Sequence, residues 1–380
     1  MVSLDVLVCT VGTSLIYPNM ESLKKQHEAG TLDDTYASVA SAYVEGKWDE
    51  LGRRLCKLDA QDKTCGAEIN STDSMVKLGF VNDATRLFFL HSDTNDGRNV
   101  ARVLCAYYGG RAQNCQIESL QDVDPREFRT KGLRNLAKQM CRILLEHRGQ
   151  ARGINATGGY KAQIAVAALI GQAVGVPVFY KHERFDDIIQ FPPMPVALDF
   201  EYWMKASGVL FDLAKTTDIV AEEDYAETVG DDERIEALIE RVEVDGQKFV
   251  ELSSVGQIFH ETFRDRFSSL RDEVVPQAVP DAQKKSPRVE RSGHVQARAE
   301  VLEFMRKVTY EVPFVKQCST WYFNPDLAAR THFRKGATGI ECVFSNGTYT
   351  AKFCVQTSAN TEGQVHAAVA ELNAWLHEAC

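Results

Sequence analysis

Asn155-Ala156-Thr157-Gly158-Gly159-Tyr160-Lys161 stands between a short predicted strand, residues 151–154, and a strongly apolar predicted helix, residues 162–174. Two consecutive glycines at a strand-to-helix turn let backbone amides come close to an oxyanion. The start of the following helix adds a partial positive charge, and Lys161 adds a full one. The stretch is typical of a phosphate-binding turn, although a glycine pair also occurs in turns that bind nothing.

Two common nucleotide-binding motifs are missing from the sequence. There is no G-x-x-x-x-G-K-[ST], which excludes an ordinary NTPase loop. The first predicted strand, residues 4–9, ends in Thr10-Val11-Gly12-Thr13-Ser14, which lacks G-x-G-x-x-G and argues against a dinucleotide. We therefore expect neither a tightly held cofactor nor a bound metal ion.

Another polar loop follows the predicted buried strand at residues 87–90. It reads His91-Ser92-Asp93-Thr94-Asn95-Asp96-Gly97 and leads into a predicted helix, residues 98–108. In an open α/β sheet, ligands bind beyond the carboxyl ends of the strands, so three such loops favour a binding site. The candidate ligand-binding residues are Thr10, Gly12, Thr13, Ser14, Ser92, Thr94, Asn155, Thr157, Gly158, Gly159 and Lys161.

Over roughly residues 1–205, these loops resemble those of the CRISPR-associated Rossmann-fold (CARF) sensor domain. Two later segments, Val176-Pro177-Val178-Phe179-Tyr180 and Phe191-Pro192-Pro193-Met194-Pro195, add to the resemblance. It implies a homodimer that binds a cyclic oligoadenylate across its two-fold axis, with cyclic tetra-adenylate as the expected ring. Such a ring suits the dimer because each subunit offers the same loops to equivalent phosphates. Whether the sensor also degrades its activator is left open.

Composition indicates a soluble cytoplasmic protein of two or three domains. The 380 residues are 25% charged and 44% hydrophobic, with no apolar run of 18 residues, so no membrane span is expected. The N-terminus lacks the basic region of a signal peptide. Ten cysteines without a C-x-x-C pair are typical of buried thiols in a reducing cytosol.

The net charge of −10 is unevenly distributed. Residues 281–293 carry four bases and two acids, and residues 294–380 carry eight of each, so the first 280 residues hold all the negative excess. An acidic sensor is a poor general binder of nucleic acid, because phosphate contacts dominate that affinity. Contact with a long RNA is therefore expected near the C-terminus.

Four segments follow one another along the predicted α/β chain. Residues 1–205 alternate strand and helix signals, which predicts a Rossmann-like, mostly parallel sheet, with a less regular helical stretch at residues 20–77. Residues 206–275 resemble a winged-helix-like linker module, with a charged helix at 232–242 and a capping box from Ser254 to Gln257. The alternative is a plain connector that transmits motion. Residues 276–293, rich in proline and bases, are predicted to be a flexible linker.

Residues 294–380 predict a small α+β domain with helices at 294–308 and 362–378. Ser345-Asn346-Gly347-Thr348 is a strong hairpin signal. A two-residue type I′ turn there pairs Phe344 with Tyr349, Cys342 with Ala351, and Ile340 with Phe353, which form an apolar face. The preceding segment alternates, placing Arg330, His332 and Arg334 on the opposite face, which is expected to be open to solvent or RNA.

This domain resembles the RelE family of ribosome-dependent mRNA interferases, small toxins with a helix-flanked antiparallel sheet. The resemblance implies a metal-independent endoribonuclease that cleaves mRNA in the ribosomal A site. Lys352 is expected opposite Glu341 in an ion pair, which leaves its role open, and no tyrosine follows Tyr349 to match the C-terminal tyrosine of some members. The candidate catalytic residues are Arg330, His332, Arg334, Lys335 and Lys352.

The chemistry of RNA cleavage fits these residue types. Attack by the RNA's own 2′-hydroxyl needs a base, an acid for the leaving oxygen, and cations for the crowded phosphorane. We assign transition-state charge stabilisation and proton transfer to Arg334 and Lys335, phosphate positioning to Arg330, and a general acid or base role to His332. The ribosome would orient the mRNA, which so small a domain does not do alone.

Two other classes of protein are weighed. A sensor fused to a HEPN ribonuclease needs an R-x(4–6)-H pair on a helix, and Arg142 with His147 or Arg288 with His294 has that spacing. The first pair falls on a predicted sensor helix, and Pro287 disfavours a helix around the second. The other class is a ligand-controlled transcription factor, against which the acidic composition of the middle module counts.

Overall fold

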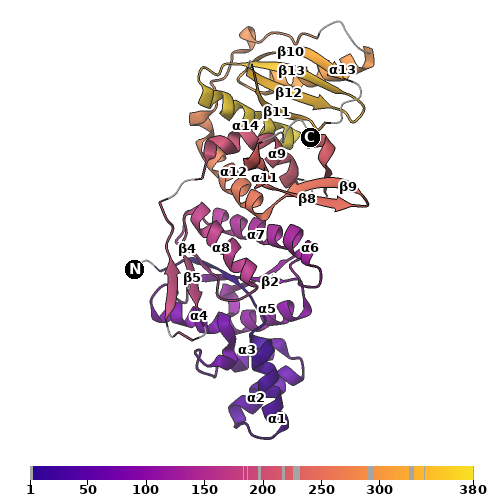
Figure 1. Ribbon diagram of the computed structural model, residues 1–380. Coiled ribbons are helices and arrows are strands. Elements are labelled where there is room, and N and C mark those ends of the chain that lie inside the picture. Colours follow the sequence, from indigo (N-terminus) through magenta and orange to yellow (C-terminus); the bar gives the residue numbers. More distant parts are fainter. Residues whose placement is uncertain are drawn as a thin grey trace. The chain divides into compact units, whose positions relative to one another are not determined.

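Figure 1 shows the computed structural model, which describes residues 3–182, 184–185, 187–195, 198–215, 219–225, 232–289, 295–324, 329–337 and 339–379. The chain divides into two compact units, Met1–Ala197 and Leu198–Cys380. Within the described ranges, no helix combines the length and apolar character that crossing a membrane requires.

The first unit is built on a six-stranded sheet in the order β3-β2-β1-β4-β5-β6. The first five strands in this order pair in parallel and β6 is antiparallel to β5, which confirms the mixed α/β fold expected from the sequence. Strand β1, in the middle of the sheet, is entirely buried, as the apolar run Val6–Cys9 predicts. The strands are β1 (Val6–Thr10), β2 (Arg86–Ser92), β3 (Ala112–Ile117), β4 (Arg152–Asn155), β5 (Val178–Lys181) and β6 (Ile188–Phe191).

Helices alternate with these strands, and the stretch of weak periodicity at residues 20–77 is helical as expected. Asp33 begins α2 by accepting the amides of Thr35 and Tyr36, which otherwise lack partners at a helix start. The helices are η1 (Leu15–Met20), α1 (Glu21–Glu28), α2 (Asp34–Val44), α3 (Trp48–Leu55), η2 (Lys63–Cys65), α4 (Gly66–Lys77), α5 (Asn95–Tyr108), η3 (Gly109–Arg111), α6 (Pro125–Glu127), η4 (Phe128–Gly132), α7 (Leu133–Glu146) and α8 (Lys161–Val174).

The second unit contains two antiparallel sheets, a three-stranded one in the order β7-β9-β8 and a four-stranded one in the order β10-β13-β12-β11. Its strands are β7 (Val220–Ala221), β8 (Ile239–Val244), β9 (Gln247–Leu252), β10 (Val315–Asn324), β11 (His332–Gly336), β12 (Gly339–Ser345) and β13 (Thr350–Thr357). Its helices are α9 (Phe200–Lys215), η5 (Glu222–Tyr225), α11 (Glu233–Glu236), α12 (Ser254–Val274), η6 (Asp281–Gln283), α13 (Val295–Glu311) and α14 (Glu362–Ala379).

The middle of the chain differs from the sequence-based expectation at three places. The charged helix expected at residues 232–242 is only the short α11, and the strand β8 follows it. Ser253, not Ser254, caps α12, since its hydroxyl accepts the Gly256 amide at 3.0 Å. The expected domain boundary near residue 205 falls inside the continuous helix α9.

Residues 276–289 were expected to form a flexible linker, and for them this expectation is wrong. The Val279 amide donates to the carbonyl of Pro313, and the Lys284 ammonium donates to the carbonyls of Thr309 and Val312 at 2.8 and 3.0 Å. The lysine thereby serves the carbonyl groups at the end of α13, which have no partner within the helix. Residues 290–293 lie outside the described residues.

The hairpin between β12 and β13 keeps the predicted faces but not the predicted register. Phe344 pairs with Ala351 and Cys342 with Phe353, a shift of two residues on β13. The Asn346 side chain accepts the amides of Thr348 and Tyr349 and thereby builds a longer loop. Because the side-chain period of a strand is two, this shift leaves the apolar residues on the core side.

The edge strand β11 is covered by side chains from two helices. Asn373 on α14 accepts the Phe333 amide at 2.8 Å and donates to the Phe333 carbonyl at 2.9 Å. The same amide group also donates to Ser207 on α9. Gly208 beside it approaches so closely that an added Cβ would lie 3.2 Å from His332. These contacts satisfy the backbone groups of Phe333 at the edge of the sheet and tie α9, α14 and β11 together.

Replacing Asn373 by alanine should destabilise the protein by about 2–4 kcal/mol, because the buried Phe333 amide and carbonyl then lose their partners. Urea denaturation followed by circular dichroism measures this. Asn360→Ala, at an exposed position before α14, is the control and should change little. A loss below about 0.5 kcal/mol for Asn373→Ala would contradict the role of Asn373 at the sheet edge.

Candidate functional site

The three glycine- and hydroxyl-rich loops of the first unit follow β1, β2 and β4, which are neighbours in the sheet. In chain order they are the first loop, the second loop and the third loop. Because parallel strands end at the same edge, these loops start side by side. The first and third loops touch. The Thr10 hydroxyl donates to the Gly158 carbonyl at 2.5 Å, and an added Cβ on Gly12 would lie 2.6 Å from the Gly159 nitrogen.

The second loop uses its hydroxyl groups to begin α5. Thr94 caps the helix by accepting the Gly97 amide at 3.0 Å, and its hydroxyl lies 2.9 Å from that of Ser92. Asp93 pairs with Arg98 at 2.9 Å. Ser92 and Thr94 therefore stabilise the position of this loop, beside the first one.

Helix α4 crosses the ends of three strands, a feature that sequence analysis missed. Glu68, Ser71 and Ser74 lie three residues apart and therefore on one side of the helix. Glu68 Oε1 accepts the Gly12 amide after β1 at 2.7 Å, and the Ser71 hydroxyl accepts from Asn155 at the end of β4 at 2.8 Å. The E-x-x-S-x-x-S spacing was the available signal, but it occurs in a stretch with weak apolar periodicity.

The third loop is held by a chain of hydrogen bonds. Asn155 Oδ1 accepts from the Thr157 hydroxyl at 2.6 Å, and that hydroxyl accepts the Lys181 amide of β5 at 3.0 Å. The Lys181 ammonium donates to Ser74 of α4 at 2.7 Å and to Gln61 at 2.9 Å. Asn155 and Thr157, proposed from sequence as ligand contacts, thus also order the loop.

Exposure separates the candidates that a ligand can reach from those that support them. Thr13 and Lys161 are exposed, Lys161 at the first position of α8, whereas Thr10, Asn155 and Gly158 are buried. Ser14 is half-buried and its hydroxyl lies 3.4 Å from the Ala67 amide of α4. The two exposed side chains and the neighbouring half-buried backbone offer hydrogen-bond donors suited to a phosphate.

The glycine pair is required by close packing. Gly159 has φ +99°, a conformation that residues with a Cβ rarely adopt. At Gly158 an added Cβ would lie 2.0 Å from Glu68 Oε1. The third loop is therefore fitted against α4, and the Glu68 carboxylate lies between Gly12 of the first loop and Gly158 of the third.

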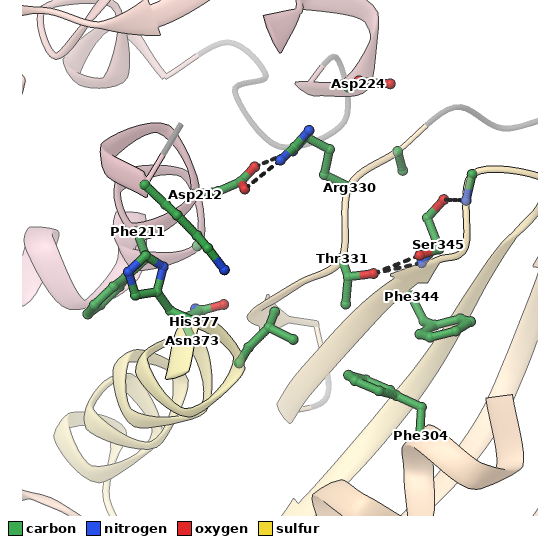
Figure 2. A pocket seen from close by; sticks show the side chains of 15 residues that line it. Phe211, Asp212, Asp224, Phe304, Arg330, Thr331, Phe344, Ser345, Asn373 and His377 are labelled. Atoms are coloured by element: carbon green, nitrogen blue, oxygen red, sulfur yellow. Dashed lines mark hydrogen bonds and ion pairs between the residues drawn. The ribbon is translucent and has the colours of Figure 1, made fainter. Parts of the chain in front are cut away.

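In the second unit, the predicted catalytic residues gather around β11. Arg330 precedes this strand and pairs with Asp212 of α9 through two hydrogen bonds, at 2.5 and 2.9 Å (Figure 2). Asp212 also accepts from the Tyr225 hydroxyl. Such a bidentate pair holds the guanidinium in one orientation.

The face that carries His332, Arg334 and Lys352 is not the open surface expected from the sequence. His332 is 5% exposed, Glu341 8% and Lys352 8%. Burial lowers the pKa of His332 to about 4, so the ring is neutral near pH 7. Its Nδ1 lies 2.8 Å from the Arg330 carbonyl, which orients the ring. Lys352 lies opposite Val343, not opposite Glu341, because of the register shift.

Glu341 pairs instead with Arg334, its partner across β11 and β12, at 2.6 Å. The Lys335 side chain lies on the opposite face of the strand from that of Arg334, and it pairs with Glu362 at the start of α14. The Arg334 side chain is 26% exposed and that of Lys335 40% exposed, so both can be reached from solvent. Arg330, Arg334 and Lys335 are thus accessible cations, whereas Lys352 is buried.

A pocket of about 600 Å³ opens beside Arg330 (Figure 2). Aromatic rings flank it in two pairs, Phe304 with Phe344 at 4.9 Å and Phe211 with His377 at 5.7 Å between centroids. Aromatic faces beside a guanidinium suit a nucleotide, whose base can stack while its phosphate meets the cation. The lining residues are Gly208, Phe211, Asp212, Lys215, Asp224, Phe304, Ala329, Arg330, Thr331, Phe344, Ser345, Gly347, Asn373, Leu376 and His377.

Comparison with known families adds an independent observation about the first unit. Residues 63–194 match the model of a CRISPR-associated protein family, Cas_APE2256. The matched range runs from η2 to beyond β6, and it includes the second and third loops. A mixed α/β unit with this match supports an association of the chain with CRISPR systems.

Gly158→Ala should disorder the third loop, because the added methyl group would overlap the Glu68 carboxylate. We expect faster amide hydrogen exchange in residues 155–161 and in the start of α4. Gly149→Ala is the matched control, since an added Cβ there meets nothing within 4 Å. Unchanged exchange in both segments would contradict the fitted packing.

The second unit should lose stability between pH 6.5 and 4 through His332. In the unfolded chain this histidine takes up a proton near its ordinary pKa, but in the folded chain only near pH 4. The neutral histidine thus contributes fully to the free energy of unfolding above pH 6.5. As the pH falls from 6.5 to 4, the free energy of unfolding decreases by about 3 kcal/mol. Urea denaturation of the wild type and of His332→Gln at pH 7 and 4.5 measures it. Equal pH dependence of both proteins would contradict the assignment.

Proposed function

We propose that the chain is a ligand-activated endoribonuclease of CRISPR defence, in which a homodimer of the first unit senses a cyclic oligoadenylate. The second unit then cleaves mRNA in the ribosomal A site. The match to a CRISPR-associated family supports the defence role. One observation carries the sensor assignment. Three glycine- and hydroxyl-rich loops follow adjacent strand ends, and Lys161 is exposed beside them.

The sensor chemistry follows from these loops. A cyclic oligoadenylate presents several phosphodiester anions and no terminal phosphate, so it needs distributed donors rather than a single deep phosphate cradle. Thr13, the backbone of half-buried Gly159, and Lys161 offer the donors closest to solvent, whereas the Gly12 amide is already bonded to Glu68. A second copy related by two-fold symmetry would present the same donors to the opposite half of the ring.

The ribonuclease assignment relies on Arg334, Lys335 and the pocket beside Arg330. We assign charge stabilisation of the phosphorane to Arg334, once Glu341 is displaced. Lys335, on the other face of the edge strand β11, is the one of the two that can give up a proton once Glu362 is displaced. Arg330 lies at a pocket with aromatic walls, where a nucleotide would stack. His332, buried and neutral, is better suited to orienting the Arg330 backbone than to proton transfer.

The rival classes have less support. Arg142 lies on α7 of the first unit near Glu146, 3.8 Å away, and His147 ends that helix against Phe88. Arg288 bridges to Ser319 in extended backbone, whereas His294 lies outside the described residues. For DNA binding, two arginines of α12 are engaged by acids, Arg264 by Glu261 at 2.7 Å and Arg271 by Glu371, and the third, Arg266, lies over the Phe200 ring.

Isothermal titration calorimetry should show binding of a cyclic oligoadenylate by the wild type, with cyclic tetra-adenylate as the tightest ring. Lys161→Ala should weaken it about tenfold or more, because one charge-assisted phosphate contact is lost. Lys25→Ala, at an exposed position on α1, is the control. If no ring size binds the folded wild type, the sensor assignment is wrong.

In a translation reaction with that activator, the wild type should cleave mRNA inside ribosomes and leave free RNA largely intact. Arg334→Ala should reduce the rate about 100-fold or more while ligand binding is unchanged. Arg306→Ala, exposed on α13, serves as the control. Cleavage of free RNA as fast as of ribosome-bound mRNA would instead favour the HEPN class.

A further inference from the structure

The Glu68 carboxylate is a buried acid at the place where the first unit is otherwise suited to an anion. Its side chain is 2% exposed. Oε1 accepts the Gly12 amide at 2.7 Å, and Oε2 has no hydrogen-bond partner among the described residues. A buried carboxylate oxygen without a donor costs stability, so its retention needs an explanation.

The surroundings of Glu68 hold little compensating charge. Desolvation is the main cause that raises its pKa, and the Gly12 amide opposes it. Cys9 on β1 is a titratable neighbour of Glu68. Burial, and to a smaller extent the negative charge of Glu68, raises the pKa of its thiol. The remaining contacts, Gly12 and Gly158, are uncharged backbone, and Lys161, which follows the third loop, is exposed.

A phosphate bound to the first and third loops would therefore meet a carboxylate between Gly12 and Gly158. An ionised Glu68 and a phosphate held against these two glycines would repel each other. A proton on Oε2 removes this repulsion. It also turns the oxygen without a partner into a donor, while Oε1 keeps its bond to Gly12.

We propose that Glu68 is a ligand-binding residue of the sensor, which contacts the phosphodiester anion in its protonated form, so that ligand binding is coupled to uptake of a proton. The proposal rests on the proposed function, because it takes the loops as the ligand site. The proton comes from solvent, and no covalent bond of the ligand changes. Ligand affinity then falls as the pH rises, up to about tenfold for each pH unit over which free Glu68 is ionised.

The experiment is calorimetry with cyclic tetra-adenylate at pH 6, 7 and 8, in buffers with different ionisation enthalpies. The wild type should take up a fraction of a proton that rises with pH towards one. Glu68→Gln keeps an acceptor for Gly12 and supplies an N–H donor in place of protonated Oε2. It should bind more tightly than the wild type at every pH where the wild type takes up a proton, by up to about tenfold for each pH unit over which free Glu68 is ionised, and with no linked proton.

Asp73→Asn is the matched control, because this acid is on the same helix but pairs with Lys77 at 2.8 Å. It should keep the proton uptake and the pH dependence of the wild type. A wild type that binds the ring without taking up a proton at any of the three pH values overturns the proposal but leaves the sensor function intact. This measurement needs no variant, so it decides the matter even if Glu68→Gln does not fold. Absence of binding by all rings overturns both.

Discussion

The parallel strands β1, β4 and β5 end in polar groups at the edge of a buried sheet, and α4 supplies partners for all three. Glu68 serves the amide after β1, Ser71 the side chain at the end of β4, and Ser74 the ammonium of Lys181. Buried polar groups without partners would cost several kcal/mol in total. The position of α4 therefore fixes the first and third loops and, with them, the geometry of the proposed ligand site.

The same arrangement limits which loop atoms meet a ligand. Thr10, Asn155 and Thr157 are used in hydrogen bonds between the strand ends and their neighbours, so their first role is to order the loops. The exposed donors, Thr13 and Lys161, can then act from a rigid frame, which lowers the entropy lost on binding. An anion site built in this way depends on supporting residues as much as on contacting ones.

The second unit holds its candidate catalytic cations in ion pairs. Asp212, Glu341 and Glu362 hold the cations Arg330, Arg334 and Lys335 in the described conformation. Ion pairs with partial exposure are weak compared with contacts to a desolvated phosphate, so a phosphate anion can compete for these cations. The charges of these three cations are therefore neutralised by carboxylates that a more strongly bound anion could displace.

Sequence alone determined the elements with strong local signals. The apolar strands, the glycine turn at Gly158 and Gly159, the helix α8 and the faces of the β12–β13 hairpin follow from side-chain periodicity and turn chemistry, which are local properties. Three features did not follow from local signals. They are the placement of α4 against the strand ends, the burial of His332 and Lys352, and the pairing of Glu341 with Arg334 instead of Lys352. These depend on which distant segments pack together and on a two-residue shift of register, and a strand's pattern is the same before and after such a shift.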